Sequence, residues 1–417
     1  MNKYSLITAG LVAAGVASSA SAQTVVRITG STAYRANVNA VLLAGTGIFD
    51  HAPTVIGAAY SAGASQLVFS NTISGSPVLI KTSFTGSEAG IASLVNVAVP
   101  NNVSGQPNAN LPGTPKPTFL DNTGTTANDV SSPDIAMADT SQAVSLTQAP
   151  GIADKGIVGV VQFVWMKGKN NGQANWAHLS NVTIPQLNVL LAAGQQDLSF
   201  ITGATADVGT PVAVFGRNKG SGTRVNTLIE ALYGVGKAVK QYAVSPTYTA
   251  GVLNRPPATT PINDAAITLI SNDGYDSGGG VANTMLMTAG GGTLTTIPIG
   301  YLGLNDANSV QALVGTGTGT AAPTGGQYLT LNGVNYSDQA ISNGAYDFWG
   351  HEHILTGPFT SATGQTVASA LVSKVAASAA GGTSGYPYIP YNGSNPTTAT
   401  MFADRPAGGD SGFVSPL

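Results

Sequence analysis

The alternation of strand-like and helix-like segments is the feature that most limits the folds open to this chain. Apolar runs at residues 212–215 and 297–304 are typical of buried strands. Residues 184–194 and the segment after Arg224 instead place apolar side chains at helical spacing, the latter as far as Val235. Because strands and helices alternate along most of the chain, the pattern predicts an α/β protein with mostly parallel sheets.

The other segments fit this scheme, apart from two that predict little regular structure. Residues 100–133 are rich in Pro, Gly, Asn and Thr, which predicts a long surface loop. The tail from Gly381 is rich in Gly, Ser, Pro and Tyr and is expected to add little to the core. The remaining predicted elements are strands at residues 25–28, 134–139 and 156–166, strands or a hairpin within residues 55–83, and helices that end near Leu43, begin near Gly86 and run over residues 365–380.

Charge and cysteine content exclude several classes of function. Only 8% of the 417 residues are charged, against about a quarter in an average soluble domain. The formal net charge is −3, and a chain without a basic excess is not expected to bind nucleic acid. Because the chain has no cysteine, disulfides, thiolate metal sites and thiol nucleophiles are excluded. No cofactor is expected.

The first 22 residues have the pattern of a secretory signal peptide. Lys3 provides a positive charge, residues 6–16 form a short apolar stretch, and Ala20-Ser21-Ala22 forms a small-residue cleavage site. Neither this stretch nor any later one is long enough to span a membrane comfortably. We therefore expect the mature protein, released by cleavage near Ala22, to be periplasmic or secreted and not membrane-spanning.

Three short turns rich in Gly, Ser and Thr each follow a predicted strand and precede a helical segment. A helix N-terminus offers backbone N–H groups and a partial positive charge, so it can bind an oxyanion without a cationic side chain. Glycine allows the backbone to approach a ligand closely, and hydroxyl groups add donors. Ser and Thr at helix starts are also ordinary N-caps, and this alternative stays open for each turn. The turns are Gly30-Ser31-Thr32, Gly86-Ser87-Glu88-Ala89-Gly90 and Gly220-Ser221-Gly222-Thr223.

The positions of these turns favour one shared site. Strands of an open α/β sheet direct their carboxyl ends toward one crevice, where ligands usually bind. Arg217 lies three residues before the third turn, and a guanidinium group can hold an oxyanion through two hydrogen bonds. A nucleotide-binding P-loop is excluded, because it needs Gly-Lys-Ser/Thr where this chain has Ser221-Gly222-Thr223-Arg224.

The order of these motifs resembles that of the phosphate-binding proteins of ABC phosphate transporters across most of the mature chain. The segment from Arg217 to Thr223 resembles the family's Arg-x-Asp-Gly-Ser-Gly-Thr signature, the most specific part of the match. The matching segments are Ile28-Thr29-Gly30-Ser31-Thr32, Gly86-Ser87-Glu88-Ala89-Gly90-Ile91, Asp134-Ile135-Ala136-Met137-Ala138-Asp139, Arg217-Asn218-Lys219-Gly220-Ser221-Gly222-Thr223, Ile299-Gly300-Tyr301-Leu302 and Asn343-Gly344-Ala345-Tyr346.

This resemblance implies a two-lobed α/β fold of the type II periplasmic binding protein kind, with two crossover strands and an inter-lobe cleft. Lobe one would comprise residues 23–160 and 305–417, and lobe two residues 161–304, with crossovers at residues 156–164 and 297–304. The protein would capture an oxyanion, phosphate above all, for an ABC transporter permease, and would not be an enzyme. The ligand contacts that carry over are Thr32, Ser87, Asp139, Arg217, Ser221, Gly222 and Thr223.

Hydrogen phosphate suits these residues because it is a dianion that still carries a proton. Hydroxyl groups, helix N–H groups and Arg217 would bind its acceptor oxygens. Asp139 would accept its O–H and repel a fully deprotonated anion such as sulfate. Three residues, Glu88, Lys219 and Ala33, differ from the family's pattern. If Glu88 faced the cleft unpaired, it would oppose a dianion, and Glu88→Ser would tighten binding.

Two other kinds of site are weaker predictions. His351-Glu352-His353 places two histidines on one face of a strand, but two histidines do not complete a zinc site. The resemblance makes this segment the strand before the last helix. No nucleophile elbow is recognisable for an enzyme. The main alternative is a secreted or cell-surface structural protein that reuses this fold, because the low charge, the loop at residues 100–133 and the Tyr-rich tail suit such a role.

Overall fold

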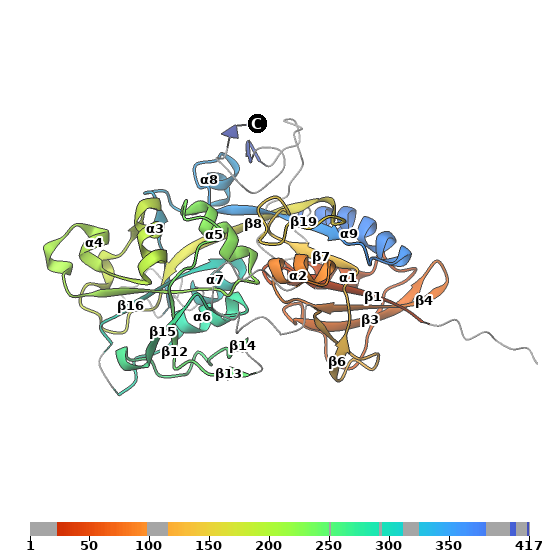
Figure 1. Ribbon diagram of the computed structural model, residues 1–417, viewed down its shortest axis with the longest axis horizontal. Helices are drawn as coiled ribbons and strands as arrows, with labels where there is room; N and C mark the ends of the chain where they lie inside the picture. Colours follow the sequence, from red (N-terminus) through yellow and green to blue (C-terminus); the bar gives the residue numbers. More distant parts are fainter. Residues whose placement is uncertain are drawn as a thin grey trace, which may run out of the picture.

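The computed structural model describes residues 23–97, 116–249, 252–291, 294–311, 325–380, 401–405 and 415–416 (Figure 1). The predicted signal peptide, residues 1–22, lies outside the described residues. The helices are α1 (Arg35–Ala44), α2 (Ser87–Leu94), α3 (Ile184–Ala193), α4 (Leu198–Thr202), α5 (Gly222–Glu230), α6 (Gly278–Leu286), α7 (Leu304–Gln311), α8 (Asp338–Ser342) and α9 (Ala362–Ala380).

One large sheet of eleven strands runs through the molecule. In spatial order its main path is β10 (Gln195–Asp197), β11 (Pro211–Phe215), β16 (Ile297–Gly303), β8 (Ala153–Lys167), β19 (Trp349–Thr356), β7 (Ile135–Ala138), β1 (Thr24–Gly30), β4 (Ser76–Ser83), β3 (Gln66–Ile73) and β2 (Thr54–Val55), and β17 (Gln327–Tyr328) also pairs with β8. Strand β1 is parallel to β4 and β7, and β11 is parallel to β16, whereas the pairs that β8 forms with β16 and β19 are antiparallel. The prediction of mostly parallel sheets is therefore wrong: the sheet is mixed, because the chain crosses it repeatedly in opposite directions.

The described residues also form short two-stranded sheets outside the large sheet. They are formed by β5 (Thr118–Leu120) with β6 (Ala127–Val130), β9 (Asn181–Val182) with β18 (Thr330–Leu331), β12 (Gln241–Val244) with β15 (Ile267–Ser271), β13 (Tyr248–Thr249) with β14 (Val252–Leu253), and β20 (Ala403–Asp404) with β21 (Ser415–Pro416).

Strand β8 joins the two halves of the sheet. Residues 153–162 of β8 pair with β19, and residues 163–167 pair with β16. In the second register Trp165 lies opposite Tyr301 and Phe163 lies opposite Gly303. The predicted adjacency of the two crossover strands is therefore confirmed, and so is the fold class, an α/β protein with two lobes linked by crossover strands.

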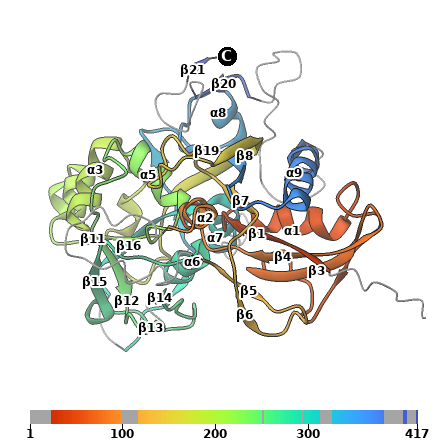
Figure 2. The ribbon, with the colours of Figure 1, turned by 45° about the vertical axis from the view of Figure 1, so that its right-hand side comes forward.

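The two lobes lie side by side in Figure 1, one around β1, β3, β4 and α1, the other around β16, α3 and α6. Both views place α9 beside α1, and the two helices are in contact (Figures 1 and 2). A core cluster made of residues from β11, β16 and α6 also includes Leu304, Ala307 and Val310 of α7. We therefore propose that the second lobe runs from about residue 161 through α7 to residue 311, seven residues beyond the boundary that the resemblance implies.

Three local predictions are corrected by the structure. Residues 116–133 are not simply a surface loop, because β5 and β6 form a hairpin that buries Phe119 and pairs Asp129 with Lys81. Helix α5 ends at Glu230 instead of continuing to Val235. Leu232 there has a left-handed backbone (φ 50°) and is 67% exposed, so the apolar spacing after residue 230 does not reflect a helix.

The C-terminal segment also departs from its prediction, because residues 401–405 reach the core. Met401 and Ala403 are buried, and Met401 belongs to the main core cluster. Arg405 is buried over the Trp349 ring, 4.7 Å from its centroid. Its Nη2 donates to the carbonyl oxygens of Asp347 (2.5 Å) and Trp349 (3.0 Å).

Arg405 also lies 3.8 Å from a carboxylate oxygen of Glu230, at the end of α5. Burial, together with the nearby Asp347, raises the pKa of Glu230 to about 8. The charge of Arg405 opposes that shift. Arg405 stabilises this junction through the two carbonyl hydrogen bonds and the ring contact.

We predict that Arg405→Ala lowers the free energy of unfolding by about 2–3 kcal/mol, because it removes two hydrogen bonds from a buried charged group and a cation–π contact. Urea denaturation of the mature protein measures this. Lys155→Ala, at an exposed cation, is the control. A loss for Arg405→Ala no larger than about 0.5 kcal/mol, typical of surface substitutions, would contradict the assignment.

Candidate anion-binding site

Asp139 is the centre of a buried cluster that brings the two lobes together. It directly follows β7, and its Oδ1 accepts a hydrogen bond from Ser87 Oγ (2.5 Å). The Thr223 hydroxyl lies 3.5 Å from Asp139 Oδ2. Gly222 packs so closely that a Cβ atom there would lie 1.6 Å from Asp139 Oδ1. Any larger residue at position 222 would displace the carboxylate, which explains why the third turn needs glycine at this position.

Arg217 is the second residue after the end of β11, in the other lobe. Its Nη2 donates to Thr32 Oγ1 (3.2 Å) and to the carbonyl oxygen of Asp276 (2.9 Å), and its Nε donates to the carbonyl oxygen of Tyr275 (3.3 Å). The side chain is almost fully buried. Burial lowers the pKa of Arg217, and the charges of Asp306, Asp276 and Asp139 oppose that shift. An arginine nonetheless stays protonated in proteins, so this is a buried positive charge.

Ser221 follows Arg217 by four residues and is the N-cap of α5. Its Oγ accepts a hydrogen bond from the Arg224 N–H (3.2 Å), so the N-cap alternative holds for this residue. Capping does not exclude ligand binding, because a hydroxyl that accepts one bond can still donate another. The first N–H groups of a helix have no partner within the helix. The start of α5 can therefore donate to an anion.

The other two turns lie at different distances from the helices that follow them. Helix α2 begins at Ser87, as predicted. Helix α1 begins only at Arg35, so Thr32 lies in a turn three residues before it, and the Tyr34 N–H donates to Ser31 Oγ (3.3 Å). The prediction that the first turn is itself a helix start is therefore wrong. Thr32 still reaches Arg217 through its hydroxyl group.

All seven residues singled out in the sequence are buried and gather at the boundary between the lobes. Sequence reasoning missed the residues that hold them there. Asn226 donates to the Asp139 carbonyl oxygen (2.7 Å) from one turn farther along α5. Arg224 donates to the Arg217 carbonyl oxygen (3.1 Å), and Tyr301 Oη accepts from the Arg217 N–H (3.0 Å). A helical spacing of four residues between Gly222 and Asn226 was the only available signal for Asn226.

Glu88 is paired, contrary to the condition under which it would oppose an anion. Its carboxylate accepts hydrogen bonds from Thr140 Oγ1 (2.9 Å), Ser145 Oγ (2.8 Å) and the Leu146 N–H (2.7 Å), and the side chain is fully buried. Burial raises the pKa of Glu88 to about 7, although these hydrogen bonds lower it. The expectation that Glu88→Ser would tighten anion binding therefore has no basis in this geometry.

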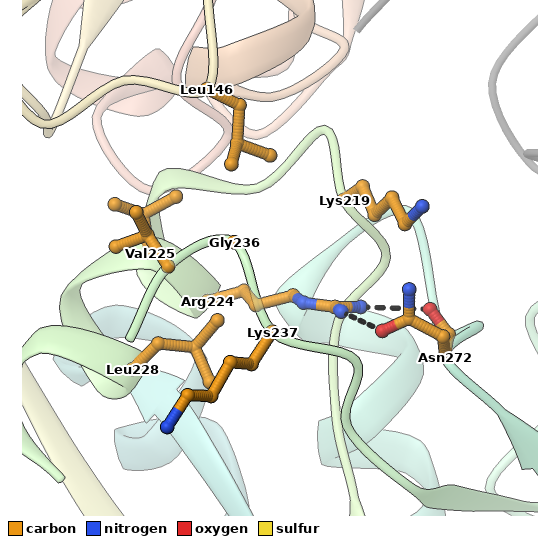
Figure 3. Close-up of a pocket in the computed structure, with 9 residues that line it drawn as sticks. Leu146, Lys219, Arg224, Val225, Leu228, Gly236, Lys237 and Asn272 are labelled. Atoms are coloured by element: carbon orange, nitrogen blue, oxygen red, sulfur yellow. Dashed lines mark hydrogen bonds between the residues drawn. The ribbon is translucent and has the colours of Figure 1, made fainter. Parts of the chain in front are cut away.

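Lys219, the second departure from the family's signature, is 6% exposed. Its burial and the neighbouring Arg224 lower its pKa to about 8. Lys219 and Arg224 both line the pocket shown in Figure 3, where Arg224 Nη1 donates to the Asn272 carbonyl oxygen (3.0 Å). Leu146 reaches this pocket from the other lobe.

The His351-Glu352-His353 segment belongs to β19, the strand before α9, as the resemblance implied. His353 Nδ1 lies 2.7 Å from Asp154 Oδ2, and the His351 ring contacts the Trp349 ring. The described residues contain no group of three or more His, Cys, Asp or Glu side chains that could hold a metal ion. None of their helices combines the length and apolar character needed to cross a bilayer.

Comparisons with known proteins give structural neighbours only. No protein-family model and no curated protein matches the chain. An ABC-type phosphate transport receptor from Vibrio cholerae is 12% identical, with 87% of this chain and 99% of that chain covered and a TM-score of 0.42. PstS from Borrelia burgdorferi is 14% identical, with 84% and 97% covered and a TM-score of 0.35. A possible phosphate binding protein from Planctomyces limnophilus is 12% identical, with 88% and 93% covered and a TM-score of 0.40.

We predict that Glu88 makes stability depend on pH. Its pKa is raised from 4.5 to about 7 in the folded state, so ionisation is harder in the folded protein than in the unfolded chain. The associated stabilisation is present below pH 4.5 and is lost as the pH rises through 7. Urea unfolding of the wild type and Glu88→Gln at pH 5 and pH 8 measures this. The wild type should lose more stability between the two pH values. Equal losses would contradict the raised pKa.

Proposed function

We propose that this protein is an exported solute-binding protein that captures an oxyanion, hydrogen phosphate above all, between its two lobes. The observation that carries the proposal is the environment of Arg217. Within the described part of the chain, its hydrogen-bond partners are neutral oxygen atoms of Thr32, Tyr275 and Asp276. A buried cation is costly. The charges of Asp306, Asp276 and Asp139 offset part of that cost, and a bound anion that accepts directly from the guanidinium group would offset more of it.

The groups around Arg217 support a protonated oxyanion. The Thr32 hydroxyl accepts from Arg217 and keeps its own proton, so Thr32 and the start of α5 supply donors for acceptor oxygens. The Asp139 carboxylate accepts from Ser87 and lies beside the Thr223 hydroxyl, and its negative charge favours a neighbouring anion that still carries a proton over one that does not. Hydrogen phosphate meets both requirements, whereas sulfate offers no proton at neutral pH and would be repelled.

Binding without chemistry fits these contacts better than catalysis. Ser87 and Thr223 direct their hydroxyl groups to the Asp139 carboxylate and not to a histidine, so these contacts do not form the Ser-His-Asp arrangement of acyl-transfer enzymes. We further propose that the signal peptide is removed near Ala22, that the mature protein is periplasmic or secreted, and that it delivers its ligand to an ABC transporter permease. The alternative of a secreted structural protein rested in part on Tyr386, Tyr388 and Tyr391, which lie outside the described residues.

We predict that Arg217→Ala weakens phosphate binding by about 10- to 100-fold, because losing a charged hydrogen-bond partner costs about 1.5–3 kcal/mol. Isothermal titration of the mature protein with phosphate measures this, and Lys155→Ala is the control. If the wild type gives no heat with either phosphate or sulfate, the proposed function is wrong.

A second prediction concerns selectivity. Asp139→Asn should reduce the preference for phosphate over sulfate, because an amide can donate a hydrogen bond where the carboxylate can only accept one. Competition titrations with both anions give the ratio of the two dissociation constants. An unchanged ratio would show that Asp139 does not accept a hydrogen bond from the ligand's O–H group.

A further inference from the structure

We propose that Glu88 is a positioning residue for this site: it holds the segment of residues 140–146 so that Asp139 faces the ligand and Leu146 meets the opposite lobe. This inference rests on the proposed function and deepens it. It assigns a binding role to a residue that does not need to touch the anion.

The start of α2 contacts two parts of the site, Asp139 and the loop at Gly220, through neighbouring residues. The φ of Gly86 is 110°, and a Cβ there would lie 2.3 Å from the Gly220 carbonyl oxygen. Ser87 donates to Asp139, and the Ala89 N–H donates to the Gly220 carbonyl oxygen across the lobe boundary (3.2 Å). Glu88 stands between these contacts, so the direction of its side chain is fixed by both lobes.

Glu88 accepts hydrogen bonds from both ends of the segment of residues 140–146, which follows Asp139. One carboxylate oxygen binds Thr140, the next residue after Asp139, and the other binds Ser145 and the Leu146 N–H. The Ser145 hydroxyl oxygen in turn accepts from the Thr147 N–H (3.0 Å). Removing the Glu88 carboxylate leaves all three donors without this acceptor, in an environment where unsatisfied polar groups are costly. The residues on either side of Asp139 and Leu146 would then be free to shift.

The far end of this segment is part of the contact between the lobes. Leu146 reaches into the pocket lined by Val225 and Leu228 of α5 (Figure 3). The Asp139 carbonyl oxygen is held by Asn226 of the same helix. Residues 139–146 therefore meet α5 at two points, and α5 is the helix whose first residues surround Asp139. Because Glu88 of α2 binds this segment, the segment links the position of α2 in one lobe to that of α5 in the other.

Glu88 acts here as a hydrogen-bond acceptor, so a neutral side chain of the same shape should largely replace it. The glutamine carbonyl oxygen can take the place of the oxygen that accepts from Ser145 and the Leu146 N–H, and the Thr140 hydroxyl can turn to accept from the amide. Alanine cannot form any of these bonds. This difference separates positioning through hydrogen bonds from an effect of charge alone.

The test is isothermal titration of the mature wild type, Glu88→Ala and Glu88→Gln with phosphate and with sulfate. Asp207→Ala is the matched control, because Asp207 is also a buried carboxylate, bonded to Thr202 and His178 away from the site. We expect Glu88→Ala to bind phosphate about tenfold or more weakly and to discriminate less against sulfate. Glu88→Gln should stay within about threefold of the wild type.

Hydrogen exchange supplies a second readout that does not depend on the ligand. The Leu146 amide should exchange faster in Glu88→Ala than in Asp207→Ala at equal temperature below their transitions. Phosphate affinity for Glu88→Ala within about twofold of the wild type, or an equal loss in the glutamine and alanine variants, would overturn this inference alone. Absence of binding to the wild type would instead overturn the proposed function.

Discussion

Strand β8 is the constraint on which the arrangement of this protein depends. Because its first ten residues pair with β19 and its last five with β16, a single hydrogen-bonded strand belongs to both lobes. The pairing of β8 therefore fixes the relative position of the two lobes where they meet at this strand. The consequence is visible at the site, where the Gly220 carbonyl oxygen lies against Gly86 and accepts from the Ala89 N–H. Only glycine permits such a close approach of two backbones.

The chain buries charges at this boundary despite its low overall charge. Asp139, Glu88, Arg217 and Arg224 are all buried there. Each is held by hydroxyl groups, carbonyl oxygens or backbone N–H groups, and this is the usual way in which a buried charge is made tolerable. The two carboxylates nevertheless have separate partners. Asp139 is placed beside the donors of α2 and α5, whereas Glu88 is used to hold residues 140–146.

The departures from the expected pattern are explained by contacts with residues that are distant in the chain. Glu88 does not oppose an anion because three donors of residues 140–146 engage its carboxylate. The C-terminal segment contributes to the core because Met401 and Arg405 find apolar and carbonyl partners far away in the chain. A tail composition rich in Gly, Pro and Tyr says little about such partners, because they are supplied by other elements.

The sequence by itself determined the α/β class, most strand and helix positions and the three turns, because hydrophobic periodicity and the Gly/Ser/Thr pattern are local properties. The resemblance in motif order also named the residues that gather around Asp139 and Arg217. The tertiary structure alone decided the mixed direction of the sheet, the extent of the second lobe, the partners of Glu88 and the buried ends of Arg217 and Arg405. These features depend on contacts between residues that are distant in the chain, such as Arg217 with Thr32. Spacing within a segment carries no information about which distant group will satisfy a buried donor or acceptor.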